Sequence, residues 1–179
     1  MRWIGWTGAA AVVALACAAA AQTPAIWRTY HNAKYGFSIA APSDVEITDS
    51  PVQTHLGATP NLRAVFGMQD GPGALAFDVT DYSGVTGGGV KTLDDPNQVL
   101  ETEIKSSVRR SDAILDSEQP VTVQGAPGRD IVFHSATVRA RSRIVYRGRR
   151  LYILAEAGPP SGAKPAEYDR LVASLHLDP

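Results

Sequence analysis

Six arginines lie close together in the last third of the chain, and they are its most distinctive candidates for binding chemistry. They are Arg139, Arg141, Arg143, Arg147, Arg149 and Arg150. The first three alternate with residues 140, 142 and 144, so a strand here would place their side chains on one face of a sheet. Guanidinium groups bind phosphate, carboxylate and sulfate groups through paired hydrogen bonds, and they also follow anionic membrane surfaces. The spacing therefore allows a site for an anionic partner.

Two other interpretations of these arginines require no partner. Acidic residues such as Asp130 and Glu156 lie in neighbouring predicted strands and could neutralise the arginine row as a solvated strand face. Charged side chains also protect an edge strand from aggregation. The sequence leaves all three interpretations open.

A glycine-rich segment, residues 84–92, has the composition of a phosphate-binding loop but lacks its spacing. Such a loop needs a lysine directly after its last glycine, and here Val90 separates Gly89 from Lys91. We therefore interpret the segment as a linker.

The residue types of catalytic and metal sites are present but scattered. The four histidines are His31, His55, His134 and His176, and none lies within four residues of another. A local pair of metal ligands would need closer spacing. The G-x-S-x-G motif of serine hydrolases does not occur. Asp78 and Asp81 stand near the end of a predicted strand and could help to build a cleft. The sequence thus predicts no catalytic residue, no metal and no cofactor, and a hydrolase would need a site that folding assembles from distant residues.

The first 21 residues have the layout of a secretory signal peptide. Arg2 gives a basic tip, residues 4–20 carry no charge, and Ala19, Ala20 and Ala21 directly precede Gln22. A retained anchor is less well supported, because a membrane span needs about 20 predominantly apolar residues. Cys17 suggests a lipoprotein signal, but Leu15 stands two places before it, whereas bacterial lipoproteins have leucine three places before. We predict a cleaved signal over residues 1–21 and a periplasmic or secreted protein, with a lipid-anchored envelope protein as the alternative.

Removal of that signal leaves residues 22–179, which is the length of one domain. The single cysteine, Cys17, would be lost with the signal, so no disulfide or thiol nucleophile would remain. The formal net charge of −1 argues against general nucleic-acid binding. We expect a monomer with no transmembrane segment in the mature chain.

Hydrophobic periodicity predicts an α+β fold. Short strands are expected over residues 35–39, 45–48, 62–68, 74–82, 113–116, 121–124, 129–135, 137–146 and 151–156, and a loop over residues 49–61. Asp94 or Asp95 can cap a helix over residues 95–110, and a second helix should open at Pro165. Strands followed by a helix, twice over, indicate a mostly antiparallel sheet covered by helices.

Both ends of the mature chain resemble the PsbP-like domains. Residues 30–42, YHNAKYGFSIAAP, resemble the opening of that group, in which a YGFS strand ends at a proline. GAPGR at 125–129, RIVY at 143–146, RRLYIL at 149–154 and ASLHL at 173–177 resemble exported bacterial members. The resemblance implies a PsbP-like sandwich. Known members include an extrinsic photosynthetic subunit, a nuclear GTPase-release factor and exported bacterial proteins of unknown role, whose common theme is binding or assembly.

Together these observations predict a non-catalytic binding or accessory module of the cell envelope, whose partner is an envelope protein or an anionic envelope component. A small periplasmic hydrolase is the alternative.

Overall fold

The computed structural model describes residues 26–179, apart from residues 55, 69–71, 87–89 and 161–165. The predicted export signal, Cys17 and His55 lie outside the described residues.

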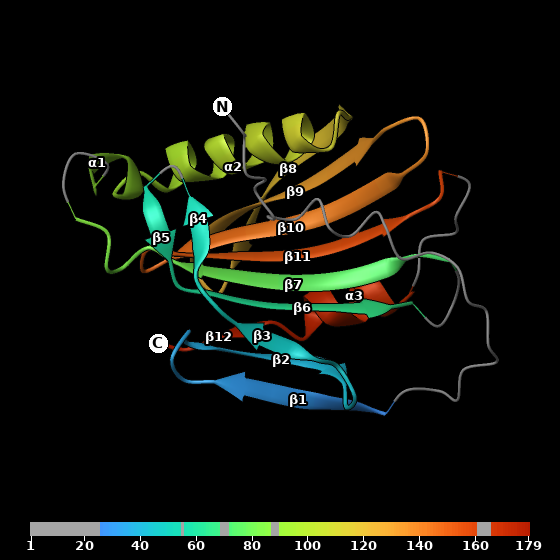
Figure 1. Cartoon of the computed structure of the whole chain (residues 1–179), viewed down its shortest axis with the longest axis horizontal. Coiled ribbons are helices and arrows are strands. Elements are labelled where there is room, and N and C mark those ends of the chain that lie inside the picture. Colours follow the sequence, from blue (N-terminus) through green and yellow to red (C-terminus); the bar gives the residue numbers. More distant parts are fainter. Residues whose placement is uncertain (1–25, 55, 69–71, 87–89, 161–165) are drawn as a thin grey trace, which may run out of the picture.

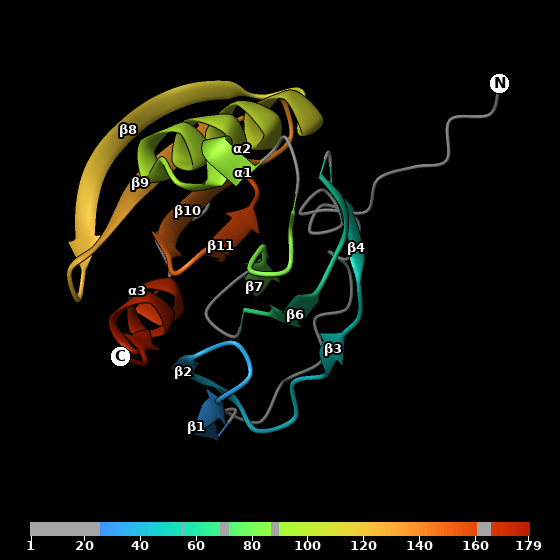
Figure 2. The same cartoon turned by 90° about the vertical axis from the view of Figure 1, so that its left-hand side faces the viewer.

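A seven-stranded sheet forms the body of the fold (Figure 1). Its strands, in spatial order, are β3 (Ile47–Asp49), β6 (Asn61–Gly67), β7 (Ala74–Asp81), β11 (Arg150–Gly158), β10 (Arg139–Arg147), β9 (Ala126–His134) and β8 (Ile114–Val123). All neighbouring strands in it are antiparallel. Figure 2 shows that the sheet curves around α2 (Pro96–Arg110), while α3 (Ala166–Ala173) lies on the opposite face. The predicted antiparallel sheet covered by helices is therefore confirmed.

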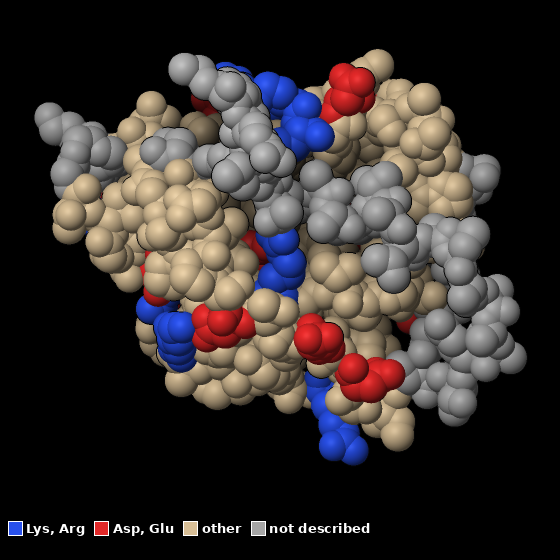
Figure 3. All heavy atoms as spheres, viewed as in Figure 1, with Lys and Arg blue, Asp and Glu red and all other residues tan. Residues whose placement is uncertain are grey.

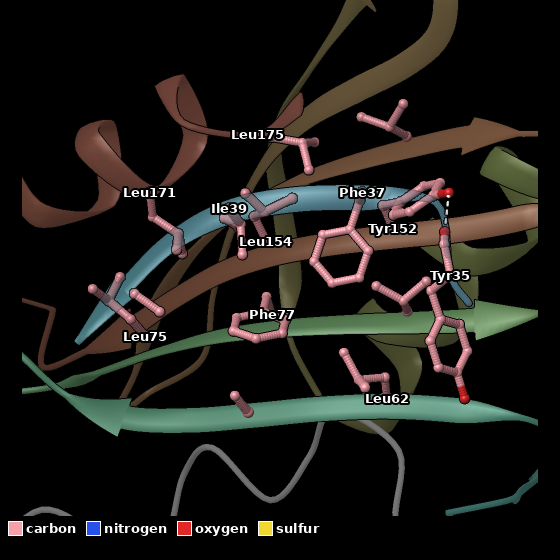
Figure 4. Packing of buried hydrophobic residues seen from close by; sticks show 14 of the residues in the cluster. Tyr35, Phe37, Ile39, Leu62, Leu75, Phe77, Tyr152, Leu154, Leu171 and Leu175 are labelled. Carbon is pink, nitrogen blue, oxygen red and sulfur yellow. Dashed lines mark hydrogen bonds between the residues drawn. The ribbon is translucent and has the colours of Figure 1, made fainter. Parts of the chain in front are cut away.

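A smaller three-stranded sheet packs with α3 against the convex face of the large sheet. Its strands are β1 (Trp27–Asn32), β2 (Phe37–Pro42) and β12 (His176–Leu177). The main hydrophobic core lies between these layers (Figure 4). Its largest fully buried side chains include Tyr35, Phe37, Ile39, Leu62, Leu75, Phe77, Leu154 and Leu171.

The YGFS motif has an architectural role in this core. The hydroxyl of Tyr152 donates a hydrogen bond of 2.8 Å to the Tyr35 carbonyl, which ties β11 to the start of β2 (Figure 4). Gly36 has a φ of +67°, in the left-handed region that favours glycine. A Cβ atom there would stand 2.9 Å from Arg150 Nη1. The backbone conformation therefore favours glycine, and a Cβ atom would in addition make the Arg150 guanidinium shift.

Tight turns set the register of the two C-terminal hairpins. In the β10–β11 turn Gly148 and Arg149 have φ values of +57° and +61°, and in the β8–β9 turn Gln124 and Gly125 have +50° and +82°. Two consecutive positive φ angles are typical of the two-residue turns whose twist matches paired strands. The hairpin predicted around residues 147–150 is thus confirmed.

Strand β8 differs from the prediction. It runs unbroken through Pro120, where the sequence predicted two short strands. Because β8 is an edge strand, the missing N–H of proline removes no hydrogen bond inside the sheet.

Helix α2 begins and ends close to the predicted positions. The Asp95 carboxylate accepts hydrogen bonds from the backbone N–H groups of Asn97 and Gln98 at 3.0 and 3.3 Å, so Asp95 is the cap. Leu100 and Ile104 are buried against the sheet. Helix α3 begins at Ala166, close to the predicted start.

Four elements of two to four residues were not predicted. The expected loop over residues 49–61 contains the paired strands β4 (Val52–Thr54) and β5 (Gly57–Thr59). The helical turn α1 (Val90–Leu93) and the two-residue strand β12 are also additional. Segments of two to four residues are too short to show a periodic pattern.

Candidate binding cleft

Four of the six clustered arginines form ion pairs within the chain. Arg141 pairs with Glu156, and its guanidinium lies 4.4 Å from the ring centroid of Tyr168. Arg143 Nη2 lies 2.6 Å from Asp130 Oδ2. Glu156 and Asp130 are the acidic neighbours that the partner-free interpretation named.

The other two pairs join the β10–β11 turn to distant parts of the chain. Arg149 Nη2 lies 2.6 Å from Asp94 Oδ1, and Arg150 Nε lies 3.1 Å from Asp81 Oδ2. Burial alone would raise the pKa of Asp81, but hydrogen bonds from Ser83 and Arg150 lower it below its usual value. These arginines therefore already serve to hold elements together.

Arg139 and Arg147 form no ion pair with any other residue that the structure describes. On the face shown in Figure 3, basic and acidic side chains are interspersed among a larger number of neutral ones. Binding of an anionic partner by the arginine cluster stays a prediction, and the two arginines above are its best remaining candidates.

A cleft between α2 and the concave face of the sheet is the main structural candidate for a site. Two rows of small side chains cross β10, β11 and β7 in register. The first row is Ser142, Ala155 and Ala76, and the second is Ala140, Ala157 and Ala74. Side chains this small leave unfilled space beneath the C-terminal half of α2. The result is a cavity of about 200 Å³ that Ser107 and Arg110 border on the helix side.

A second, smaller cavity of about 100 Å³ lies towards β4, beneath the N-terminal half of α2. The two cavities share four lining residues, which are Arg63, Asp78, Arg110 and Ile153. We call these four residues the throat of the cleft. The charged groups of the throat border a larger cavity whose lining is mostly apolar, whereas the smaller cavity also has several threonine, asparagine and glutamine side chains in its lining.

Asp78 organises one side of the throat. Its carboxylate accepts hydrogen bonds from Arg63 Nε and Asn61 Nδ2, both at 2.7 Å, and Arg63 Nη2 lies 2.5 Å away. Asn61 also donates to Thr80 Oγ1 at 3.1 Å. Strands β6 and β7 position these groups, because Arg63 and Asp78 are direct cross-strand partners.

Arg110 organises the other side from the end of α2. Its Nη2 donates to Glu103 Oε1 at 2.7 Å, and Ser107 donates to the same oxygen at 2.8 Å. Tyr82 lies nearby, and burial, reinforced by the negative charges of Glu103 and Asp78, raises its pKa well above the usual value. Arg110 Nε is buried and has no hydrogen-bond partner among the described residues.

This arrangement is suited to holding a ligand. The two arginines of the throat are balanced by Asp78 and Glu103. Neither histidine nor cysteine occurs among the described lining residues of either cavity. Asp78, which the sequence placed as a possible cleft residue, does line both cavities, whereas Asp81 lines neither.

The sequence contains one signal of this cleft. Small residues alternate with larger ones in β7, β10 and β11, as in Ala74 and Ala76 or Ala155 and Ala157. Such alternation within one strand is ordinary. A cavity follows only when three strands from distant parts of the chain align their small residues side by side.

The described histidines lie outside the cleft. His134 Nδ1 lies 2.7 Å from Asp116 Oδ1, but both side chains are about a third or more exposed. His31 and His176 are exposed. Within the described ranges, no group of three or more His, Cys, Asp or Glu residues is placed to hold a metal ion.

Comparison with solved structures identifies the fold. The chain is similar to the cyanobacterial PsbP of Synechocystis sp. PCC 6803, with a TM-score of 0.56 and 13% identity over 92% of this chain and 98% of that one. It also matches a Bacteroides thetaiotaomicron protein (TM-score 0.45, 15% identity, 80% of this chain and 45% of that one). A Pseudomonas aeruginosa protein of unknown function, described as a putative regulator, gives a TM-score of 0.42 at 12% identity over 75% of this chain and 84% of that one.

The chain therefore has a PsbP-like fold, as the resemblance at its two ends implied. Comparisons with protein-family models and with curated proteins give no match. Among the described residues, no helix has the length and apolar character needed to cross a bilayer.

Proposed function

We propose that the protein is a non-catalytic binding module of the cell envelope that holds a small ligand in the cleft beneath α2. The observation that carries this proposal is the unfilled space on the concave face, which has a volume of about 200 Å³ and shares the four throat residues with a smaller cavity. Protein interiors are close-packed, so space of this size in a folded domain needs a reason. A largely apolar pocket with a few convergent polar groups is the usual form of a small-molecule site.

The envelope location rests on the N-terminal sequence. Residues 1–21 have the basic tip, uncharged middle and small-residue end of an export signal. Mass spectrometry of the protein from fractionated cells tests this directly. We expect a periplasmic form that begins near Gln22; a full-length form in the cytoplasm would contradict it.

The cleft is tested with 1-aminoanthracene, an uncharged probe whose fluorescence rises in apolar surroundings. We expect saturable binding to the purified protein. Ala155→Leu places a larger side chain in the row that floors the cavity and should abolish binding while leaving the melting temperature unchanged, because the cavity can accept the added atoms. Ala173→Leu, at an exposed position in α3 on the opposite face of the sheet, is the matched control and should bind as wild type. Equal binding by all three proteins would rule out the cleft as the site.

The hydrolase alternative is less well supported, because its best histidine–carboxylate pair, His134 and Asp116, lies on the exposed surface. The hydrolase alternative would be supported if the protein hydrolysed p-nitrophenyl acetate and His134→Ala abolished this activity. We expect no such turnover above the buffer rate.

The arginine cluster is tested separately. Arg139→Glu combined with Arg147→Glu should leave the fold intact, since neither has an ion pair within the described part of the chain. Arg141→Glu should lower the melting temperature, because it places a carboxylate against Glu156 and removes the cation over the ring of Tyr168. Loss of binding to anionic lipid vesicles in the double variant would support an anionic-partner site, and unchanged binding would remove it.

A further inference from the structure

We infer that the ligand of this cleft is an uncharged amphipathic molecule with an apolar body and a carbonyl group. The inference rests on the proposed function and specifies which chemistry the cleft selects.

The charge balance of the throat disfavours an ionised ligand. Arg63 is neutralised by Asp78, and Arg110 by Glu103, at distances of 2.5 and 2.7 Å between the charged atoms. A carboxylate added beside them would leave one unbalanced negative charge in a region of low polarity. Burying an unpaired charge is costly, whereas an uncharged polar group needs only a hydrogen bond.

Two polar atoms offer that hydrogen bond. Arg110 Nε is a buried donor without an acceptor among the described residues. Ser142 lines the larger cavity and is only 6% exposed, and no hydrogen bond of its hydroxyl is formed with any other described residue. An N–H donor needs an acceptor such as a carbonyl oxygen, and a hydroxyl can donate or accept.

The rest of the larger cavity accepts an apolar body. Val65, Phe133 and Val138 border it, and its floor is formed by alanines of the two rows, which are Ala76, Ala140, Ala155 and Ala157. The polar throat lies at one side of this apolar space, because the row that contains Ile153 and Asp78 is adjacent to the row that contains Ala155. A chain with a polar group at one end therefore matches the order of the lining.

Octanamide and octanoate test the inference, because they share a chain length and differ in the charge of the head group at pH 8. We expect octanamide to bind the purified protein about tenfold more tightly than octanoate by isothermal titration calorimetry. Octanoate binding as tightly as octanamide would overturn the preference for an uncharged ligand.

Two variants test the proposed donors. Ser142→Ala should lower the affinity for octanamide about threefold, which is the loss expected for one neutral hydrogen bond. Arg110→Lys keeps the positive charge but removes Nε, and it should lower the affinity for octanamide about tenfold. The matched controls are Ser117→Ala and Arg109→Lys, both at exposed positions, and should bind as wild type.

The Ser142 variant removes only a hydroxyl and should fold normally. If both this variant and a folded Arg110 variant bind octanamide with unchanged affinity, the assignment of the donors is overturned. If 1-aminoanthracene binds in the Ala155-dependent way but octanamide does not bind, the ligand class is wrong and the proposed function stands. If neither compound binds, the proposed function itself fails.

Discussion

Replacing Asp78 with asparagine should destabilise the protein by about 3 kcal/mol, because it removes the carboxylate that pairs with Arg63 in the throat. The substitution keeps the size of the side chain, so it creates no cavity. In the wild type the carboxylate receives hydrogen bonds from Arg63 Nε and Asn61 Nδ2, both at 2.7 Å. The side chain of Asp78 is 12% exposed and that of Arg63 is 23% exposed, so water screens this pair only weakly.

The size of the effect follows from this geometry. Removing one partner of a buried ion pair costs about 3–5 kcal/mol, and we take the lower end because the guanidinium retains some contact with solvent. In a domain of this size about 3 kcal/mol corresponds to a fall in melting temperature of about 10 °C.

Urea unfolding followed by circular dichroism measures the free energy of unfolding. Asp44→Asn is the control, since Asp44 is exposed and its substitution should change stability by less than about 0.5 kcal/mol. The double variant Asp78→Asn with Asn61→Ala should lose less than the sum of the single losses, because the two side chains share a hydrogen bond. A loss below about 1 kcal/mol for Asp78→Asn, or the same loss as for Asp44→Asn, would refute the view that this pair is buried and coupled.

Three further predictions concern the scaffold. Gly36→Ala should lower the free energy of unfolding, measured in urea, by about 2 kcal/mol because of the left-handed φ of Gly36 and the nearby guanidinium. Gly67→Ala should leave it nearly unchanged, because an added Cβ there meets nothing within 4 Å. Asp95→Ala should lower the free energy of unfolding by about 1 kcal/mol, because it removes the cap of α2. Asp94→Ala removes only an exposed ion pair, so an equally large decrease for this variant would contradict the assignment of the cap. Burial raises the pKa of Tyr146 from its ordinary 10.0 to about 12. Between pH 10 and pH 12 the unfolded chain therefore releases a proton that the folded chain keeps. The free energy of unfolding falls as pH rises through this range. Tyr146→Phe should make this fall less steep in denaturation curves between pH 9 and 12; an unchanged slope would contradict it.

Local patterns were sufficient for much of the scaffold. The four-residue spacing of Leu100 and Ile104 identified α2, and Gly148 between two alternating runs identified the β10–β11 hairpin. The motif around Gly36 indicated the PsbP-like fold. Each of these signals lies within a few residues of sequence, where helix and turn geometry act directly.

The roles of the arginines illustrate a partial success. Alternation correctly placed Arg141 and Arg143 on one face, and their cross-strand partners were named in advance. The pairing of Arg150 with Asp81 was not foreseen, because it depends on β11 lying beside β7 across 69 positions of sequence. Strand order in a sheet is decided by packing between distant segments, and periodicity within each strand does not record it.

The sequence by itself determined where the helices and most of the strands form and which residues open and close them, because these depend on neighbours along the chain. Only the tertiary structure decided that Ser142, Ala155 and Ala76 lie in one row. It also brought Arg63 of β6 and Arg110 of α2 to the same throat. A cavity is formed by the side chains that fail to fill a shared space, and that space exists only after distant strands and a helix have packed together.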